Sequence, residues 1–249
     1  MINFDKIILK ILPGDKDNLN PKRLVGYIKK EYRETKGSKR IYIILGGWHE
    51  ASWLSDILKR KIIKKKYSYL HYKIKPEILS VKAGLTYKAF MGIKKKVIAD
   101  IKSIKDKFSE IIVIGTSLHT TSAPMIVNNC KEVSKIILVC PGHCLAESLW
   151  KGIRTQNLKE AFIKQGINLE KLKKIWKDLA PENNINKMVG KEVVIYNSKL
   201  DKSIPYWCGN ILIKKMRKIG INPIVKTNKY LGHYLTILYF YLFNNEILK

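Results

Sequence analysis

The chain has 249 residues, of which 46% are hydrophobic and 27% are charged. A chain of this length and composition buries enough apolar surface to fold without disulfides or a structural metal, which excludes disordered and fibrous proteins. The 48 Lys and Arg against 20 Asp and Glu give a formal net charge of +28, which is typical of proteins that bind nucleic acids or other anions. We expect a single domain over residues 1–249.

The type of base argues against a dedicated nucleic-acid binder. The sequence contains 42 Lys and 6 Arg, whereas proteins that read bases or hold phosphates rely on the bidentate fork of Arg. The densest basic run, residues 59–66, has the character of the solvated end of a surface helix. We therefore expect no specific nucleic-acid partner, although a surface of this charge attracts anionic molecules, and attracts them less at high salt.

The sequence has no segment that resembles a membrane span or a secretory signal. Its longest apolar stretch, residues 235–243, is about half as long as a membrane helix requires. An acid, Asp5, stands where a secretory signal has bases. The four cysteines are too few and too scattered for a disulfide scaffold. These features predict a cytoplasmic protein with reduced thiols, and the sequence carries no signal for an oligomeric state.

Short runs of β-branched and apolar residues alternate with longer segments of helical periodicity. This alternation predicts an α/β fold with a mostly parallel central sheet flanked by helices. The predicted strands are residues 40–45, 111–114, 136–140, 192–196 and 223–227. The predicted helices are residues 87–108, 118–131, 206–219 and 234–243. Ahead of them, residues 7–12 are expected to form a strand and residues 22–32 a helix.

Residues 142–190 break this alternation. They contain no strand-like run, and their apolar residues recur at helical spacing from Leu158 to Leu179. We interpret the segment as a helical cap inserted between the third and fourth predicted strands. Ligands of open α/β sheets bind beyond the carboxyl ends of the strands, so this cap is expected to cover the site.

A serine follows one of the predicted strands at a sharp turn. The strand of residues 111–114 runs through Gly115 into Ser117 and then directly into a predicted helix. Such a turn holds a serine hydroxyl clear of the sheet and directs the next backbone N–H, here that of Leu118, toward a developing oxyanion. Taken alone, the pattern is also typical of an ordinary turn serine.

Two later loops supply the other side chains that a serine nucleophile requires. Asp201 follows the fourth predicted strand, in a loop that ends at Pro205, and His233 follows the fifth in a Gly-His loop. Asp201 lies 84 residues after Ser117, and His233 lies 32 residues after Asp201. With the strand-turn-serine pattern, this order of Ser, Asp and His resembles the α/β-hydrolase superfamily. The resemblance extends from about residue 40 to the end of the sequence.

The sequence departs from the Gly-x-Ser-x-Gly pattern of this superfamily at one position. His119 stands where the pattern has its second glycine. The resemblance implies a catalytic triad in which Ser117 is the nucleophile and His233 the general base. Asp201 then orients the imidazole and stabilises its protonated form.

The resemblance also implies an oxyanion hole made of two backbone N–H groups. One is that of Leu118, and the other is that of Trp48, in the Gly-Gly-Trp loop that follows the first strand of the predicted sheet. Gly47 in that loop, its neighbour His49, and His119 lie next to these residues in sequence. We expect these three residues to contribute to substrate binding.

No metal or organic cofactor is predicted. Cys140, His143 and Cys144 lie close together but have no fourth partner at zinc-like spacing. The expected reaction is hydrolysis of a carboxylic ester or thioester of a small acyl substrate through an acyl-Ser117 intermediate. Because fold does not determine function, two alternatives remain. One is a non-catalytic descendant of the fold that binds a ligand, and the other is a lysine-rich protein that binds anionic surfaces or nucleic acids.

Overall fold

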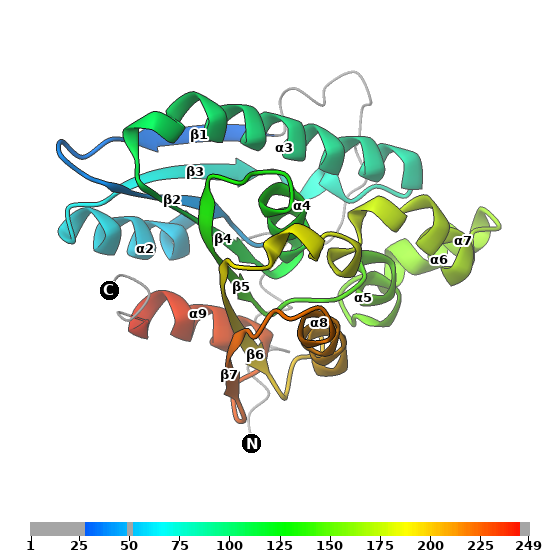
Figure 1. Cartoon of the computed structure of the whole chain (residues 1–249). Helices are drawn as coiled ribbons and strands as arrows, with labels where there is room; N and C mark the ends of the chain where they lie inside the picture. Colours follow the sequence, from blue (N-terminus) through cyan, green and yellow to red (C-terminus); the bar gives the residue numbers. More distant parts are fainter. Residues whose placement is uncertain (1–27, 49–51, 245–249) are drawn as a thin grey trace.

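The computed structural model describes residues 28–48 and 52–244 (Figure 1). Its strands are β1 (Ile28–Arg33), β2 (Arg40–Leu45), β3 (Ser68–Ile74), β4 (Glu110–Thr116), β5 (Val133–Val139), β6 (Glu192–Ser198) and β7 (Ile224–Asn228). They form one seven-stranded sheet in the order β1-β3-β2-β4-β5-β6-β7. β1 pairs antiparallel with β3, and the remaining neighbours in the sheet pair in parallel. The predicted mostly parallel sheet is therefore confirmed.

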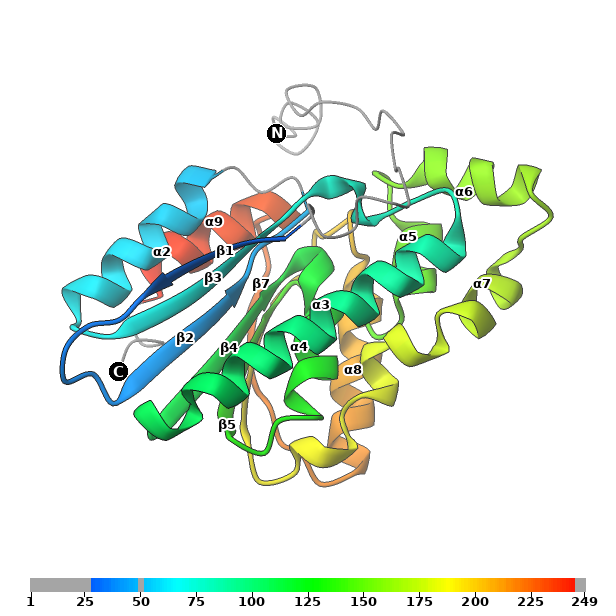
Figure 2. The same cartoon turned by 90° about the horizontal axis from the view of Figure 1, so that it is seen from above.

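Helices cover both faces of this sheet. The α-helices of the described residues are α2 (Ser52–Lys64), α3 (Ala83–Ile104), α4 (Ser122–Val127), α5 (Leu145–Lys151), α6 (Gln156–Lys164), α7 (Leu169–Ile175), α8 (Tyr206–Lys218) and α9 (His233–Phe243). The short 3-10 helices are η2 (Pro76–Ile78), η3 (Lys105–Lys107), η4 (Ser117–Thr120), η5 (Lys177–Leu179), η6 (Pro181–Asn183) and η7 (Asn186–Met188). Figures 1 and 2 show α2 and α9 on one face and α3, α4 and α8 on the other. Across residues 28–48 and 52–244, no helix combines the length and the apolar character that crossing a bilayer demands.

The two faces of β2 show why helices are needed on both sides. Ile41, Ile43 and Leu45 belong to the apolar cluster that also contains residues of α3, α4 and α8. Tyr42 and Ile44 belong to the cluster with α2 and α9. Side chains alternate across a strand, so a continuous apolar run requires cover on both faces. Because β2, β4, β5, β6 and β7 are parallel, the loops that follow them gather at one edge of the sheet, where ligands of such folds bind.

The five strands predicted from residue 40 onward are confirmed, with shifted ends. β5 ends at Val139 rather than at Cys140, because Cys140 adopts a left-handed backbone conformation with φ of 55°. The helix predicted over residues 87–108 begins and ends four residues earlier, as α3. The helix predicted over residues 118–131 is instead the 3-10 helix η4 followed by the short helix α4.

The predictions for the start of the chain have a different outcome. A helix over residues 22–32 is wrong for its described part, because Ile28–Arg33 forms the edge strand β1. Only Ile28 of this strand is partly buried, and its polar residues hide the strand character from the sequence. The strand predicted over residues 7–12 lies outside the described residues.

The basic run of residues 59–66 lies at the end of α2, as expected, but it is not solvated throughout. Lys59 is buried, and its ammonium forms ion pairs of 2.7 Å with the carboxylates of Glu31 and Asp56. Ile62 is also buried, in the cluster beneath α2 and α9. Part of the charge in this run therefore stabilises the edge of the sheet and is not displayed to partners.

Residues 142–190 are helical, as predicted, and contain α5, α6 and α7. Figures 1 and 2 show these helices gathered at one end of the molecule. Within the segment, the ring of Trp176 packs edge-on against that of Phe162 in α6, with centroids 5.7 Å apart. The indole N–H of Trp176 also donates to the carbonyl of Ala83 at 2.9 Å, at the start of α3. The segment is thus packed on the core rather than held by its ends alone.

Candidate active site

The chain turns sharply where β4 gives way to η4. Ser117, the first residue after the strand, has a φ of 52°. A non-glycine residue in this left-handed region costs about 1–3 kcal/mol, and such residues cluster at active sites. Gly115 explains the tightness of the turn, because a Cβ there would lie 2.7 Å from both the Cβ of Ala123 and the carbonyl oxygen of His119. The turn presents Ser117 at the carboxyl edge of the sheet, as the sequence pattern predicts.

His119 fits beneath this turn without displacing Ser117. Its side chain is buried, its Nδ1 lies 3.1 Å from the Oγ of Ser122, and its ring lies 6.0 Å from that of Phe90. It is not among the described residues that line the cavity beside Ser117. Its position therefore gives no support to the predicted contribution of His119 to substrate binding.

The loop after β6 fixes the carboxylate of Asp201. Its Oδ1 accepts hydrogen bonds from the backbone N–H groups of Ser203 at 2.9 Å and Ile204 at 2.8 Å. Its Oδ2 lies 2.6 Å from the Nδ1 of His233. Both side chains are buried, so this contact is shielded from water and electrostatically stronger than it would be at the surface.

The loop after β7 delivers His233 as the first residue of α9. This loop is held to the end of β6 by the hydroxyl of Ser198, which donates to the carbonyl of Leu231 at 2.5 Å. The Nε2 of His233 lies 2.7 Å from the Oγ of Ser117. Hydroxyl, imidazole and carboxylate thus stand in series, although they come from three loops that are far apart in the sequence.

A cavity of about 560 Å³, which includes space open to solvent, lies beside the Ser117 hydroxyl. Its lining residues are Trp48, Leu79, Ser117, Leu118, Thr120, Thr121, Gly142, Leu145, Ser148, Leu149, Arg154, Thr155, Ser203, Ile204, His233 and Tyr234. Six of these residues, Gly142 to Thr155, belong to the segment that we predict to be a cap. The segment therefore forms one wall of the space in front of the serine.

The two residues predicted to supply oxyanion donors both line this cavity. Leu118 follows Ser117 directly, and Trp48 lies in the loop after β2. The indole N–H of Trp48 donates to the carbonyl of Pro76 at 2.8 Å, which fixes the side chain at the cavity edge. Gly47 is half-buried and is not among the lining residues, and the predicted binding residue His49 lies outside the described residues.

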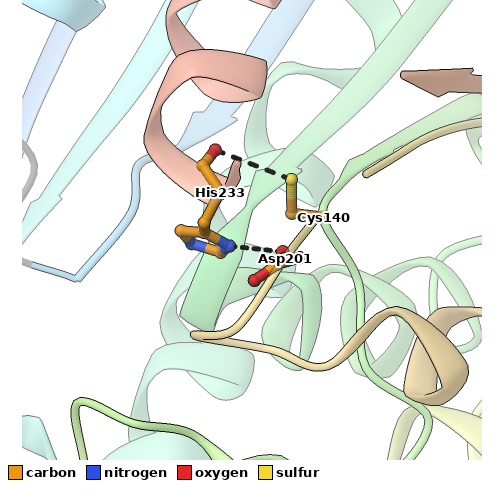
Figure 3. A group of neighbouring side chains, drawn as sticks. All are labelled: Cys140, Asp201 and His233. Atoms are coloured by element: carbon orange, nitrogen blue, oxygen red, sulfur yellow. Dashed lines mark hydrogen bonds and ion pairs between the residues drawn. The ribbon is translucent and has the colours of Figure 1, made fainter. Parts of the chain in front are cut away.

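A third side chain lies next to the Asp-His pair. Figure 3 shows Cys140 beside Asp201 and His233, and the donor atoms of the three lie within 4.8 Å of one another. The Cys140 thiol donates to the carbonyl of His233 at 3.9 Å. A metal ion could in principle use this set, but the carboxylate of Asp201 already accepts three hydrogen bonds, one of them from the imidazole. The contacts fit an imidazole N–H of His233 donated to Asp201, with the Cys140 thiol donating to the backbone carbonyl of His233.

Sequence-based reasoning misses several residues that line the cavity, among them Arg154 and Tyr234. Tyr234 follows His233, and the two rings meet edge-on with centroids 5.2 Å apart. Burial raises the pKa of Tyr234, while the nearby guanidinium of Arg154 opposes that rise. The scarcity of arginine in a lysine-rich chain is the one sequence signal that singles out Arg154, and the signal applies equally to the other arginines.

Comparison with known proteins tests the fold. No protein-family model matches the sequence, and none of the curated proteins matches it. The chain is similar to the Pyrococcus furiosus esterase Pf2001, with a TM-score of 0.59 and 17% identity over 95% of this chain and 93% of that one. It is similar to Est1E from Butyrivibrio proteoclasticus, with a TM-score of 0.58 and 14% identity over 89% of this chain and 91% of that one. For the Pyrococcus horikoshii acylaminoacyl peptidase, the TM-score is 0.62 and the identity 11%, over 95% and 40% of the two chains.

The sheet order, the single antiparallel edge strand and these likenesses together define the class of protein: the chain has the α/β-hydrolase fold. The resemblance inferred from the sequence is thereby confirmed at the level of fold. At identities of 17% and below, the likeness does not extend to the reaction, which has to be argued from the residues at the site.

Burial of His119 predicts a measurable effect of pH on stability. Burial lowers the pKa of His119 to about 3. Below pH 6.5 the unfolded chain binds a proton at this residue that the folded chain does not, so stability falls as the pH drops from 6.5 toward 3. At pH 5 the loss from this residue is about 2 kcal/mol relative to pH 7.5.

Chemical denaturation of the wild type and of His119→Gln at both pH values measures this effect. The comparison cancels other titrating groups, because only His119 differs between the two proteins. We expect the free energy of unfolding to fall by about 2 kcal/mol more in the wild type than in His119→Gln. An equal fall in the two proteins would show that His119 is not held neutral in the folded state.

Proposed function

We propose that this chain is a serine hydrolase that cleaves a carboxylic ester or thioester of a small molecule through an acyl-Ser117 intermediate. The observation that supports the proposal is the continuous row of contacts from the Oγ of Ser117 through His233 to Asp201, at 2.7 and 2.6 Å. A serine hydroxyl is a weak nucleophile at neutral pH and requires a base within hydrogen-bond reach. The imidazole of His233 meets that requirement.

The first half of the reaction transfers the acyl group to the enzyme. The Oγ of Ser117 attacks the carbonyl carbon while its proton passes to the Nε2 of His233. The carboxylate of Asp201 keeps the other proton of the imidazole on Nδ1 and stabilises the imidazolium as it forms. His233 then gives its proton to the departing alcohol or thiol, which leaves Ser117 acylated.

The second half returns the enzyme to its starting state. A water molecule loses a proton to His233 as it attacks the acyl carbon, and the bond to Ser117 breaks with return of the proton to Oγ. In both halves negative charge develops on the carbonyl oxygen, for which we propose the backbone N–H groups of Leu118 and Trp48 as donors. Loss of one such donor typically lowers kcat by about 10²–10³-fold.

Two other functions were compatible with the sequence. A non-catalytic descendant of the fold has no need for a strained serine, yet Ser117 has a φ of 52° and lies within hydrogen-bond distance of His233. An anionic-surface or nucleic-acid binder would rely on the net charge of +28, part of which is held in ion pairs such as those of Lys59. These observations favour the hydrolase. The cytoplasmic location remains a prediction from the sequence.

A substrate panel tests the proposed reaction. Wild-type protein is offered 4-nitrophenyl acetate, phenyl thioacetate and 4-nitroacetanilide, which present the same acyl group as an ester, a thioester and an amide. We expect turnover of the ester and the thioester, and much slower turnover of the amide. Ser103→Ala, at an exposed serine of α3, serves as a matched control and retains wild-type rates. Absence of turnover on all three compounds would contradict the proposal.

A further inference from the structure

The cavity in front of Ser117 contains a charged side chain that the proposed reaction does not use. Arg154 lies in the loop between α5 and α6 and lines the cavity together with Ser117 and His233. The other lining residues are apolar, glycine, or carry hydroxyl groups. Among the described lining residues there is no Asp or Glu, so the guanidinium is the permanent charge of this space.

The position of Arg154 is set by two aromatic rings. Its guanidinium carbon lies 5.6 Å from the ring centre of Trp48 and 5.2 Å from that of Tyr234. One of its N–H groups donates to the hydroxyl of Tyr234. Trp48 belongs to the loop proposed to hold an oxyanion donor, and Tyr234 follows the proposed base His233. The guanidinium therefore lies between the two loops that flank the reacting centre.

The hydrogen-bonding capacity of Arg154 is largely unused. A guanidinium has five N–H donors. Within residues 28–48 and 52–244 it forms no ion pair, and its hydrogen bond goes to the Tyr234 hydroxyl alone. A half-buried charge without an opposite charge is costly unless a bound partner supplies one. The arrangement thus leaves room for an anion.

A second polar group faces the same space. Ser148 of α5 lines the cavity and is 7% exposed. Its hydroxyl lies beside the Cys208 thiol but has no hydrogen-bond partner of ordinary geometry. Buried hydroxyls without partners are uncommon in folded proteins. The oxygen itself is buried against Gly142, so the guanidinium of Arg154 remains the group that a substrate in the cavity can reach.

We propose that Arg154 binds a carboxylate carried by the substrate, so that the preferred esters or thioesters are acidic. This inference rests on the proposed hydrolase function and narrows its substrate class. The planar fork of arginine matches a carboxylate bidentately, which a lysine cannot do. The net charge of +28 also attracts anionic substrates toward the protein. The 42 lysines supply the general charge of this chain, but only an arginine in the cavity can bind both oxygens of a carboxylate in a fixed geometry.

Two pairs of esters test the inference. Monomethyl succinate and methyl butyrate differ by a carboxylate in place of a methyl group on the acyl part. 3-Acetoxybenzoate and phenyl acetate differ by a carboxylate on the alcohol part. We expect kcat/KM to favour the acidic member of at least one pair by about 10- to 100-fold, the usual value of a charge-assisted contact. The pair that responds identifies the part of the substrate that carries the acid.

Two variants test whether Arg154 is the source of the preference for acidic esters. In Arg154→Met, which keeps the aliphatic stem between the rings, the ratio of kcat/KM within the responding pair is expected to fall by about 10- to 100-fold. Arg217→Met removes an exposed arginine of α8 outside the cavity and is expected to keep the wild-type ratio. A wild-type enzyme without acidic preference in either pair, or a preference that Arg154→Met leaves unchanged, overturns the inference.

Calorimetry separates failure of this inference from failure of the proposed function. Succinate is titrated into Ser117→Ala protein, with and without the added change Arg154→Met. Binding that is lost with Arg154→Met supports the anion site, even if none of the esters is hydrolysed and the proposed function fails. Equal binding by the two proteins, or no binding by either, overturns the anion site whatever the esterase assays show.

Discussion

Ser117→Ala is expected to lower kcat on an ester substrate by at least about 10⁴-fold while leaving the fold intact. The hydroxyl of Ser117 is the group that we propose to form the covalent intermediate, and among the described residues it is the hydroxyl that lies 2.7 Å from the Nε2 of His233. Activity that remains would come from the oxyanion donors and from substrate binding, which act without the serine. Steady-state rates with 4-nitrophenyl acetate, corrected for spontaneous hydrolysis, measure this loss.

The change is small enough for a clean interpretation. Alanine removes one oxygen from a half-exposed side chain and leaves the packing of Gly115 beneath it unchanged. Ser103→Ala on the exposed surface of α3 provides the matched serine-to-alanine control, with wild-type activity expected. If Ser117→Ala retained more than about a tenth of wild-type kcat, an acyl-Ser117 intermediate would be untenable. Removal of a serine nucleophile lowers kcat by far more than about tenfold.

Asp201→Asn is expected to lower kcat by about 10⁴-fold, because the substitution favours a tautomer of His233 that cannot accept the serine proton. In the proposed mechanism the carboxylate oxygen Oδ2, 2.6 Å from the Nδ1 of His233, holds the proton there and leaves Nε2 free to receive the Ser117 proton. An amide N–H at that position favours the opposite tautomer, with the proton on Nε2, and the base is then blocked. Substrate binding does not require this proton, so KM should change far less than kcat.

The surroundings of Asp201 make a folding defect distinguishable from a catalytic one. The amide oxygen of Asn can still accept the backbone N–H groups of Ser203 and Ile204, which Oδ1 of the aspartate accepts at 2.9 and 2.8 Å. The loop should therefore keep its shape, and the melting temperature should change little. Asp106→Asn, at an exposed residue of η3, is the matched control. A kcat within tenfold of the wild type would show that Asp201 does not orient the base.

The parts of the fold that the sequence predicts well are those that are buried on both faces. β2, β4 and the second half of β5 are continuous apolar runs, because helices cover both sides of the sheet there. β3 escaped prediction although its first five residues are buried. It contains Ser68, whose hydroxyl accepts the N–H of Thr35 at 3.0 Å, and the buried His71, so polar residues interrupt its apolar pattern. The hydrogen bond of Ser68 joins it to a residue 33 positions earlier in the chain, and sequence periodicity does not report such contacts.

The sequence likewise predicts some features of the candidate site and misses others. The order of Ser117, Asp201 and His233 is visible in the sequence because each follows a strand, and parallel strands bring their following loops to one edge. The orientation of a side chain is not visible. His119 turns into the core against Phe90, and Arg154 reaches the cavity through the packing of the segment that carries α5 and α6. Both outcomes depend on how helices pack, which local sequence does not determine.

Active-site labelling with a fluorophosphonate, followed by peptide mass spectrometry, tests the central claim most directly. The reagent reacts only with a serine whose hydroxyl is activated by a neighbouring base, and the adduct identifies that serine. We predict a single adduct on the peptide that contains Ser117, no adduct in Ser117→Ala, and labelling at least about 10²-fold slower in His233→Ala. An unlabelled wild-type protein, or an adduct at another serine, would contradict the account.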